Sequence, residues 1–195
     1  MRKYLVGFLV AGAAVGLRYA GPFDARAEPG WLETGVARAV RAWTVPSKYR
    51  QMRNPVSCDA GVLTAAREHW ADHCAVCHGN NGSGQTMFGR GMYPKPPDMR
   101  LAETRMQSDG ALYSTIKYGV RLTGMPAFGE PGDHDHDSWA LVCFIRHLPE
   151  MTPDEELAMR AMNPKTEADR EEERQEEEFL NGGTPPATAT PVHRH

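Results

Sequence analysis

The stretch His73–Gly79 reads His-Cys-Ala-Val-Cys-His-Gly and contains a Cys-x-x-Cys-His pattern at Cys74, Cys77 and His78. Two cysteines at this spacing lie about one helical turn apart, so both thiols can reach the same edge of a flat macrocycle. The histidine that follows directly can then place its imidazole beneath the centre of that ring. The pattern predicts a haem attached covalently through the two thiols, with His78 as an axial ligand of its iron. Because the motif occurs once, we expect one haem.

A Cys-x-x-Cys pair has other uses, and each needs a context that this chain lacks. A thioredoxin-type redox pair would follow a βαβ pattern, and none precedes Cys74. A zinc site would need a second Cys-x-x-Cys or a His-x-x-x-His downstream, and the sequence contains neither. The adjacent His78 therefore favours haem attachment over these alternatives and over coincidence.

Length and composition limit the number of domains and the class of protein that this motif can belong to. A chain of 195 residues accommodates one or two domains, and its apolar fraction of 41% with abundant Gly, Pro and charge suggests a compact core with poorly packed ends. The net charge of −3 gives no support for nucleic-acid binding.

Residues 1–27 are predicted to be a signal peptide or a membrane anchor. A short positive start precedes an apolar run from Tyr4 to Leu17, and Ala25-Arg26-Ala27 resembles a small-x-small cleavage site. The run is shorter than the roughly 20 residues that span a bilayer, but residues 4–23 together form an acceptable span. Both alternatives stay open. Both predict a periplasmic protein or one on the outer face of the cytoplasmic membrane.

Residues 28–57 form an amphipathic connecting segment. Apolar residues recur at helical spacing from Trp31 to Trp43, with Arg38 and Arg41 between them. Such a helix can lie on a membrane surface or pack on the following domain, and the sequence does not decide between the two. The globular domain is expected to begin near Cys58, after the prolines of this segment.

Residues 58–150 carry three helical patterns. The first, Asp59–His73, leads directly into the motif, and the second, Asp109–Tyr118, is expected to stop at Gly119. The third, Asp137–Leu148, is apolar almost all round and should be buried against the first, with Asp137 or Ser138 as its N-cap.

Two further residues are candidates for the haem site. Pro96 lies in a stiff, proline-rich stretch whose carbonyls lack helical partners, so its carbonyl is a candidate acceptor for the Nδ1 proton of His78. Met125 lies between Gly124 and Pro126, on a loop that can aim its thioether at an iron. Its position follows no amphipathic periodicity, unlike that of a methionine that fills a gap in a core. Weaker candidates for the second axial ligand are Met87, Met92 and Met99.

Histidines and acids elsewhere have simpler interpretations. The run Asp133–Asp137 alternates Asp and His and could bind a transition metal, but a solvated acidic helix start is favoured. Residues 151–195 are predicted to be a helical to disordered acidic tail. A helix is expected to start at Thr152-Pro153, and the final His193-Arg194-His195 is expected to be unstructured.

With Cys74, Cys77, His78 and the Met125 loop in place, residues 58–150 resemble the class I cytochrome c family. The order of helix, Cys-x-x-Cys-His, proline-containing loop, helix, Met loop and aromatic closing helix matches that family. Within the family it looks most like small bacterial monohaem cytochromes with an N-terminal membrane segment. In those, Tyr113-x-x-Ile116-Lys117-x-Gly119 followed by Gly124-Met125-Pro126 has close counterparts. The resemblance implies an all-α cytochrome c fold with His78 and Met125 as axial ligands. The acidic tail has no counterpart in it.

Cys58 and Cys143 lie outside the minimum of that family. Two spare thiols in an oxidising compartment suggest a disulfide. The alternative is that Cys143 is buried as a small apolar residue, and the sequence slightly favours this alternative.

The predicted function is electron transfer outside the cytoplasm by a haem whose iron cycles between Fe(III) and Fe(II). With both axial positions filled there is no site for a substrate, so we expect an electron carrier rather than an enzyme, with redox proteins as donor and acceptor. Two alternatives remain. The chain could be the haem subunit of a larger membrane redox enzyme. It could also be an open-iron peroxidase or gas sensor. Against this, the sequence shows no obvious distal histidine for peroxide chemistry, although His69, His73 and His147 stay open as candidates.

Overall fold

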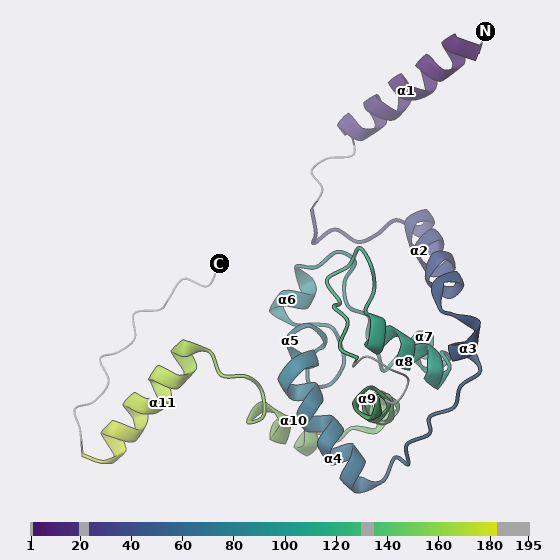
Figure 1. Ribbon diagram of the computed structural model, residues 1–195. Helices are drawn as coiled ribbons and strands as arrows, with labels where there is room; N and C mark the ends of the chain where they lie inside the picture. Colours follow the sequence, from purple (N-terminus) through teal and green to yellow (C-terminus); the bar gives the residue numbers. More distant parts are fainter. Residues whose placement is uncertain (1, 20–23, 130–134, 183–195) are drawn as a thin grey trace.

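The structure is a computed structural model that describes residues 2–19, 24–129 and 135–182 (Figure 1). Every regular element in these ranges is helical, in agreement with the all-α fold expected from the sequence. In chain order the elements are α1 (Arg2–Tyr19), α2 (Trp31–Thr44), α3 (Ser47–Arg50), α4 (Ala60–His69), the π-helical turn η1 (Trp70–Cys74), α5 (Ala75–His78), α6 (Met87–Arg90), α7 (Ala102–Arg105), α8 (Asp109–Tyr118), α9 (His136–His147), the 3₁₀ turn η2 (Leu148–Glu150), α10 (Pro153–Arg160) and α11 (Glu167–Leu180).

Helix α9 is the centre of the packed part of the chain. Its residues 138–145 are all buried, and both α4 and α8 pack against it. Trp139 of α9 stacks on Tyr113 of α8 with ring centroids 4.1 Å apart, and Phe144 of α9 lies 5.3 Å from Trp70. Fully burying an apolar side chain of this size contributes roughly 1.5–3 kcal/mol. The prediction that the closing helix is buried against the first is confirmed.

The ends of α8 are set by its flanking residues. The Ser108 hydroxyl oxygen accepts the N–H of Ala111 at 3.2 Å, which satisfies a donor of the first turn. Gly119 follows with φ of 65°, and a Cβ there would lie 2.6 Å from the Pro126 carbonyl carbon and oxygen. Only glycine fits both this backbone conformation and this close approach, so the predicted stop at Gly119 is confirmed.

The N-cap of α9 differs from the prediction. Asp135, not Asp137 or Ser138, caps the helix: its Oδ1 accepts the Ser138 N–H at 3.0 Å and its Oδ2 accepts the Ser138 hydroxyl at 2.7 Å. The helix therefore begins at His136, before the apolar pattern that the sequence shows. The correction follows from burial, because Asp135 is only 5% exposed and its carboxylate is satisfied by the helix start.

The packed domain includes residues that precede Cys58. Tyr49 of α3 is 2% exposed and belongs to the core. The Tyr49 hydroxyl lies 2.7 Å from the Tyr118 hydroxyl. The Tyr49 carbonyl packs directly on Gly110 of α8, where the Cβ of any other residue would collide with it. The sequence did not reveal this contact, because Tyr49 and Met52, the two apolar residues between Pro46 and Pro55, are too few to show a periodicity.

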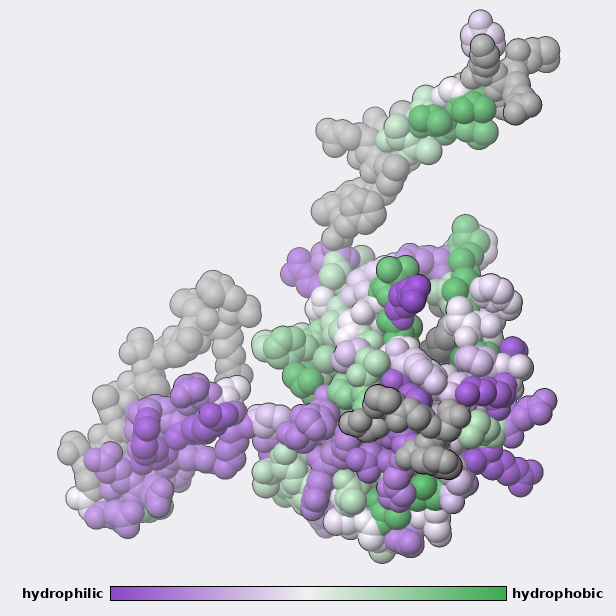
Figure 2. Space-filling view, viewed as in Figure 1, coloured by the Kyte–Doolittle hydropathy of each residue, from purple (hydrophilic) through white to green (hydrophobic). Residues whose placement is uncertain are grey.

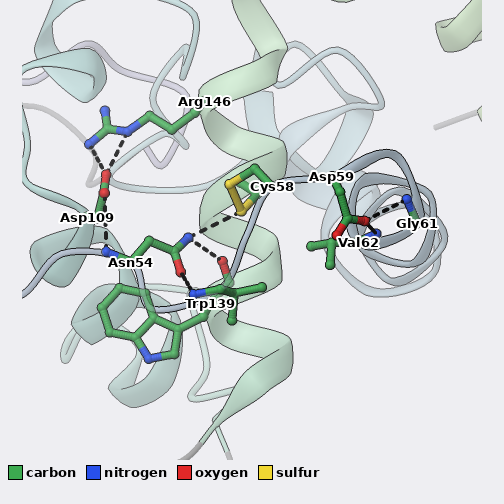
Figure 3. The surroundings of a disulfide bond; sticks show 10 residues. Asn54, Cys58, Asp59, Gly61, Val62, Asp109, Trp139 and Arg146 are labelled. Carbon is green, nitrogen blue, oxygen red and sulfur yellow. Dashed lines mark hydrogen bonds and ion pairs between the residues drawn. A yellow bond between two sulfur atoms is a disulfide. The ribbon is translucent and has the colours of Figure 1, made fainter.

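A disulfide joins Cys58 to Cys143, with a Cα–Cα distance of 5.4 Å (Figure 3). The slight preference for a free, buried Cys143 was therefore wrong. Next to the bridge, Asn54 Nδ2 donates to the Trp139 carbonyl at 2.9 Å, and Asn54 Oδ1 accepts the Val56 N–H at 2.9 Å. The bridge and the Asn54–Trp139 bond hold the chain that leads into α4 against α9, while the Asn54–Val56 bond shapes that chain locally.

Glu155 ties three helices together near the end of the packed domain. In α10 it forms a capping box with Thr152, whose N–H donates to Oε2 at 2.9 Å. Its Oε1 also accepts from Arg67 of α4 and from His147 of α9, both at 3.0 Å. The helix start predicted at Thr152-Pro153 is confirmed, and the same carboxylate links it to the core.

Glu155→Gln is expected to lower the free energy of unfolding by about 1–2 kcal/mol at pH 7, because an amide replaces the charged acceptor of these bonds. The Thr152 N–H and then His147 lower the pKa of Glu155 from its ordinary value of 4.5. Its contribution is therefore present above pH 4.5 and is lost as the pH falls through the folded pKa. Urea unfolding at pH 7 and pH 3 tests this, and an equal loss at both would contradict it. Glu156→Gln, one position along, is the control.

Almost all described side chains of the outer helices α1, α2 and α11 are exposed. Apolar residues of α1 and α2 lie on the surface, whereas α11 is strongly hydrophilic (Figure 2). The predicted acidic segment thus contains a helix, and residues 183–195, with the final histidines, lie outside the described ranges. In the part of the chain that the structure describes, none of the helices combines the length and the hydropathy that a membrane crossing demands.

Candidate functional site

The Cys-x-x-Cys-His motif lies at the end of one continuous helical stretch. Helix α4 ends at His69, a π-helical turn occupies Trp70–Cys74, and α5 follows at Ala75–His78. A π turn holds one more residue than an α turn, so it rotates everything after it relative to α4. Helix α4 can therefore face α9 while the motif faces another direction. The sequence predicted the helix but gave no sign of the wide turn.

Cys74 and Cys77 are unbridged thiols, and both are partly exposed. Burial, with a smaller contribution from Cys77, raises the pKa of Cys74 to about 12, and burial also raises the pKa of Cys77. Both side chains are therefore neutral thiols at neutral pH. They lie one helical turn apart, as covalent attachment to one edge of a macrocycle requires.

The imidazole of His78 is buried against Trp70, with ring centroids 5.7 Å apart, and is only 9% exposed. Burial lowers the pKa of His78 to about 4, so the ring is neutral at pH 7 and its nitrogens can act as ligands. Its Nδ1 is buried and has no hydrogen-bond partner among the described residues. The predicted bond from Nδ1 to the Pro96 carbonyl is therefore not formed in this structure.

The segment after His78 folds back onto the motif. Gly84 donates its N–H to the His78 carbonyl at 2.8 Å, and the Trp70 indole donates to the Gly79 carbonyl at 3.0 Å. The Pro96 carbonyl oxygen packs closely on Gly84: a Cβ added at Gly84 would lie only 2.5 Å from it. The proline-rich stretch thus approaches the motif as expected, but its contact is with Gly84 rather than with the His78 ring.

Thr86 is a positioning residue that the sequence did not reveal. Its hydroxyl donates to the carbonyl of Val76 at 2.8 Å and lies 3.2 Å from that of Cys77. The same oxygen accepts the Gly89 N–H at 2.8 Å and so caps α6. A single hydroxyl therefore joins the carbonyl end of the motif helix to the start of the next one. A Thr three residues before a glycine gives no pattern that would predict this role.

The loop that carries Met125 folds back on α8. The Met125 carbonyl accepts the Val120 N–H at 3.1 Å, and the Met125 N–H donates to the Thr123 hydroxyl at 3.2 Å. Three residues later, the Phe128 N–H donates to the Ile116 carbonyl at 3.1 Å. The Phe128 ring lies 6.5 Å from the ring of His73, the residue before Cys74. The fold thus brings the end of the Met125 loop next to the motif.

Residues 61–145 match the family model described as cytochrome C oxidase, cbb3-type, subunit III. The match covers α8, nearly all of α4 and α9, the motif and the Met125 loop. This part of the chain is a c-type cytochrome domain. Its family binds haem c covalently, and two neutral thiols one turn apart beside a buried, neutral imidazole with an unpartnered nitrogen fit that cofactor. No individual curated protein matches the chain.

The other methionines of the cytochrome domain have different surroundings. Met99 is 9% exposed and packs in the core, and Met87 is 65% exposed on α6. The terminal methyl of Met92 packs directly against Gly124, where it would meet any added Cβ. The fold therefore places Met92 beside the Met125 loop.

The structure also shows the surroundings of His69, His73 and His147, the histidines considered for an open iron. His69 and His73 form a pair with ring centroids 4.9 Å apart, and His147 Nε2 is bonded to Glu155. Within residues 2–19, 24–129 and 135–182, no three His, Cys, Asp or Glu side chains gather where they could hold a metal ion. Asp133 and His134 belong to the run Asp133–Asp137, for which a solvated acidic helix start was favoured over metal binding, and they lie outside these ranges.

Trp70→Phe in the cytochrome domain is expected to cost about 2 kcal/mol of unfolding free energy, because it removes the bond to Gly79 and leaves unfilled volume. Amide exchange at Gly84, whose N–H bonds the His78 carbonyl, should become faster. Urea unfolding and hydrogen exchange of the haem-loaded protein measure both effects. Trp139→Phe removes similar volume elsewhere and should leave the Gly84 exchange rate unchanged. Faster exchange in both variants would contradict a local role for Trp70.

Proposed function

We propose that the cytochrome domain is an electron carrier that holds one haem through Cys74 and Cys77, with His78 and Met125 as axial ligands of the iron. The single observation that carries the proposal is the motif geometry: two neutral thiols and a buried, neutral imidazole follow one another on a single helical turn. The Met125 loop supports it, since Phe128 lies beside His73 and places that loop next to the motif.

The bound haem supplies one-electron exchange between the ferric and ferrous states of its iron. The chain's own residues hold the ligands in place. Trp70 packs on His78 and fixes the following turn through Gly79, which restrains the imidazole. The backbone bond from Phe128 to Ile116 restrains the Met125 loop on α8, and the bond from Val120 to Met125 closes the loop itself. With both ligands held in this way, little rearrangement accompanies a change of charge, and the buried core around Trp70 and Phe144 excludes water.

A second candidate is that the chain is the haem-bearing subunit of a larger redox complex. The matching family model is described as a subunit of an oxidase, and that description supports this alternative. Segments outside the match, α2 with its exposed apolar residues and the acidic α11, offer surfaces for assembly. Purification in mild detergent separates the two candidates: a complex subunit co-purifies with its partners, whereas a free carrier is isolated alone. Redox proteins are the electron donor and acceptor in both.

We place this activity outside the cytoplasm, in the periplasm or on the outer face of the cytoplasmic membrane. The Cys58–Cys143 disulfide supports this location, because disulfides form and persist in oxidising compartments. The positive start and apolar run of residues 1–27 support it too, as an export signal or as an anchor.

Absorption spectra of the purified haem protein, ferric and ferrous, with carbon monoxide added to the ferrous form, test the proposal. A low-spin ferric spectrum with the near-infrared sulfur-to-iron band, and no response to carbon monoxide, is the result expected for a closed site. A high-spin spectrum or rapid carbon monoxide binding would contradict the carrier function. It would instead favour a peroxidase or gas sensor with an open iron.

A further inference from the structure

Helix α2 has one apolar face, and that face is exposed. Five apolar residues fall within one half of its circumference by helical register, whereas Ala37 and Arg38 fall in the other half. Exposed fractions on the apolar face run from 51% at Val40 to 86% at Trp31. The five residues, which we call the α2 apolar face, are Trp31, Leu32, Val36, Val40 and Trp43.

The opposite face of α2 is the one that contacts the cytochrome domain. Arg38 forms an ion pair with Glu103 of α7. Glu33 is hydrogen-bonded to Tyr93, an interaction that raises the pKa of Tyr93. Just before the helix, Glu28 pairs with Lys95 of the same proline-rich stretch. A helix that simply covers its own domain buries its apolar residues and exposes its charges. Helix α2 does the reverse, so its apolar face points away from the domain.

Basic residues surround this face. Residues 34–58 contain five Lys and Arg and no Asp or Glu, in a chain whose net charge is −3. Three of them, Lys48, Arg50 and Arg53, follow α2 directly and are exposed. A second copy of the chain seated on the α2 apolar face would bring two such basic segments together, which like-charge repulsion opposes. An anionic surface would instead be attracted to them.

We propose that the α2 apolar face inserts into the interface of an anionic lipid membrane and holds the cytochrome domain next to it. Trp31 and Trp43 lie at the two ends of the face, and tryptophan favours the boundary between headgroups and acyl chains. The basic residues after α2 contact the lipid headgroups, since an anionic surface attracts Lys and Arg that lie close to it. The bonds of Arg38, Glu33 and Glu28 to the domain fix its orientation. The proposal concerns the surface alone and does not depend on the electron-transfer function.

Tryptophan fluorescence of the full-length haem protein tests this with a local readout. The four tryptophans divide into exposed Trp31 and Trp43, and Trp70 and Trp139, which are each 2% exposed inside the domain. Vesicles of phosphatidylglycerol and phosphatidylcholine in equal parts, with lipids brominated near the headgroup end of their acyl chains, quench only tryptophans that insert. We expect quenching of Trp31 and Trp43, confirmed by its loss in the double variant Trp31→Phe, Trp43→Phe.

Two single substitutions place the same charge on opposite faces of α2. Val36→Asp, in the apolar face, is expected to weaken insertion about tenfold, since burying a valine side chain corresponds to one or two powers of ten in partition. Ala37→Asp, one residue along on the face turned to the domain, is expected to leave the quenching unchanged. Because the two variants carry the same α1, the difference in quenching between Val36→Asp and Ala37→Asp reports insertion of the α2 apolar face even where α1 also binds the vesicle.

Three results would overturn the proposal. The first is no quenching in the unsubstituted protein, and the second is equal quenching in both Asp variants. The third is sedimentation as a dimer that Val36→Asp dissociates, which would assign the face to a second copy. Pure phosphatidylcholine vesicles, or high salt, should reduce the quenching. Equal quenching without anionic lipid would refute the role of the basic residues.

Discussion

Met125→Ala is expected to convert the cytochrome domain from a closed to an open haem site. The ferrous variant should bind carbon monoxide completely, whereas the unsubstituted protein should not respond. The near-infrared sulfur-to-iron band of the ferric form should disappear as well. The physical reason is that alanine has no thioether, while the loop itself stays anchored: the backbone bonds of Val120 and Phe128 do not involve the Met125 side chain.

Met92→Ala is the matched comparison for this prediction. Met92 is also a flexible thioether, and its terminal methyl already contacts Gly124, the residue before Met125. If Met125 is the ligand, Met92→Ala should keep the sulfur-to-iron band and remain insensitive to carbon monoxide. The opposite pattern would make Met92 the ligand and Met125 a residue that positions the loop. Carbon monoxide binding in the unsubstituted protein would contradict thioether ligation by either residue.

Removing the Cys58–Cys143 bridge is also expected to have a large effect, in this case on the stability of the fold. The double variant Cys58→Ser, Cys143→Ala is expected to lose about 4 kcal/mol of unfolding free energy, because the bridge closes a loop of 85 residues in the unfolded chain. In urea this corresponds to a midpoint lowered by roughly 2 M for a domain of this size. The spectrum of the bound haem should stay the same, since Cys74 and Cys77 are untouched.

Two controls accompany this measurement. Unfolding the unsubstituted protein in the presence of a thiol reductant should give a similar loss, whereas the reductant should not affect the double variant. Alkylation followed by mass spectrometry should modify no cysteine of the native haem protein before reduction. Two alkylated thiols at that stage would show that Cys58 and Cys143 are unpaired in solution and would contradict the structure.

Local signals made much of the fold predictable. Gly119 ends an apolar helical pattern, so α8 was predicted with its observed limits, Asp109–Tyr118. The capping box of Thr152 and Glu155 likewise marked the start of α10. In both helices the information lies within a few residues of the element itself. The same holds for Cys74, Cys77 and His78, where the spacing alone predicts the chemistry.

Features that depend on distant contacts could not be predicted in this way. The disulfide is decided by the packing of α4 on α9, which brings the Cα atoms of Cys58 and Cys143 to 5.4 Å. Tyr49 enters the core only because Gly110, far along the chain, leaves space for its carbonyl. The Pro96 prediction placed the right segment near the motif, but its carbonyl packs on Gly84 instead of bonding to His78.

The Cys58–Cys143 bridge also determines how the protein carries mechanical load. A pull on the two ends of the chain would pass through the bridge and bypass the residues between the two cysteines, about 290 Å of extended polypeptide. The motif and the Met125 loop both lie within this bypassed segment, whereas α2 and α11 lie outside it. Tension on either outer helix, from a surface or from a partner, would therefore reach α9 through a covalent link without stretching the chain that holds the haem ligands.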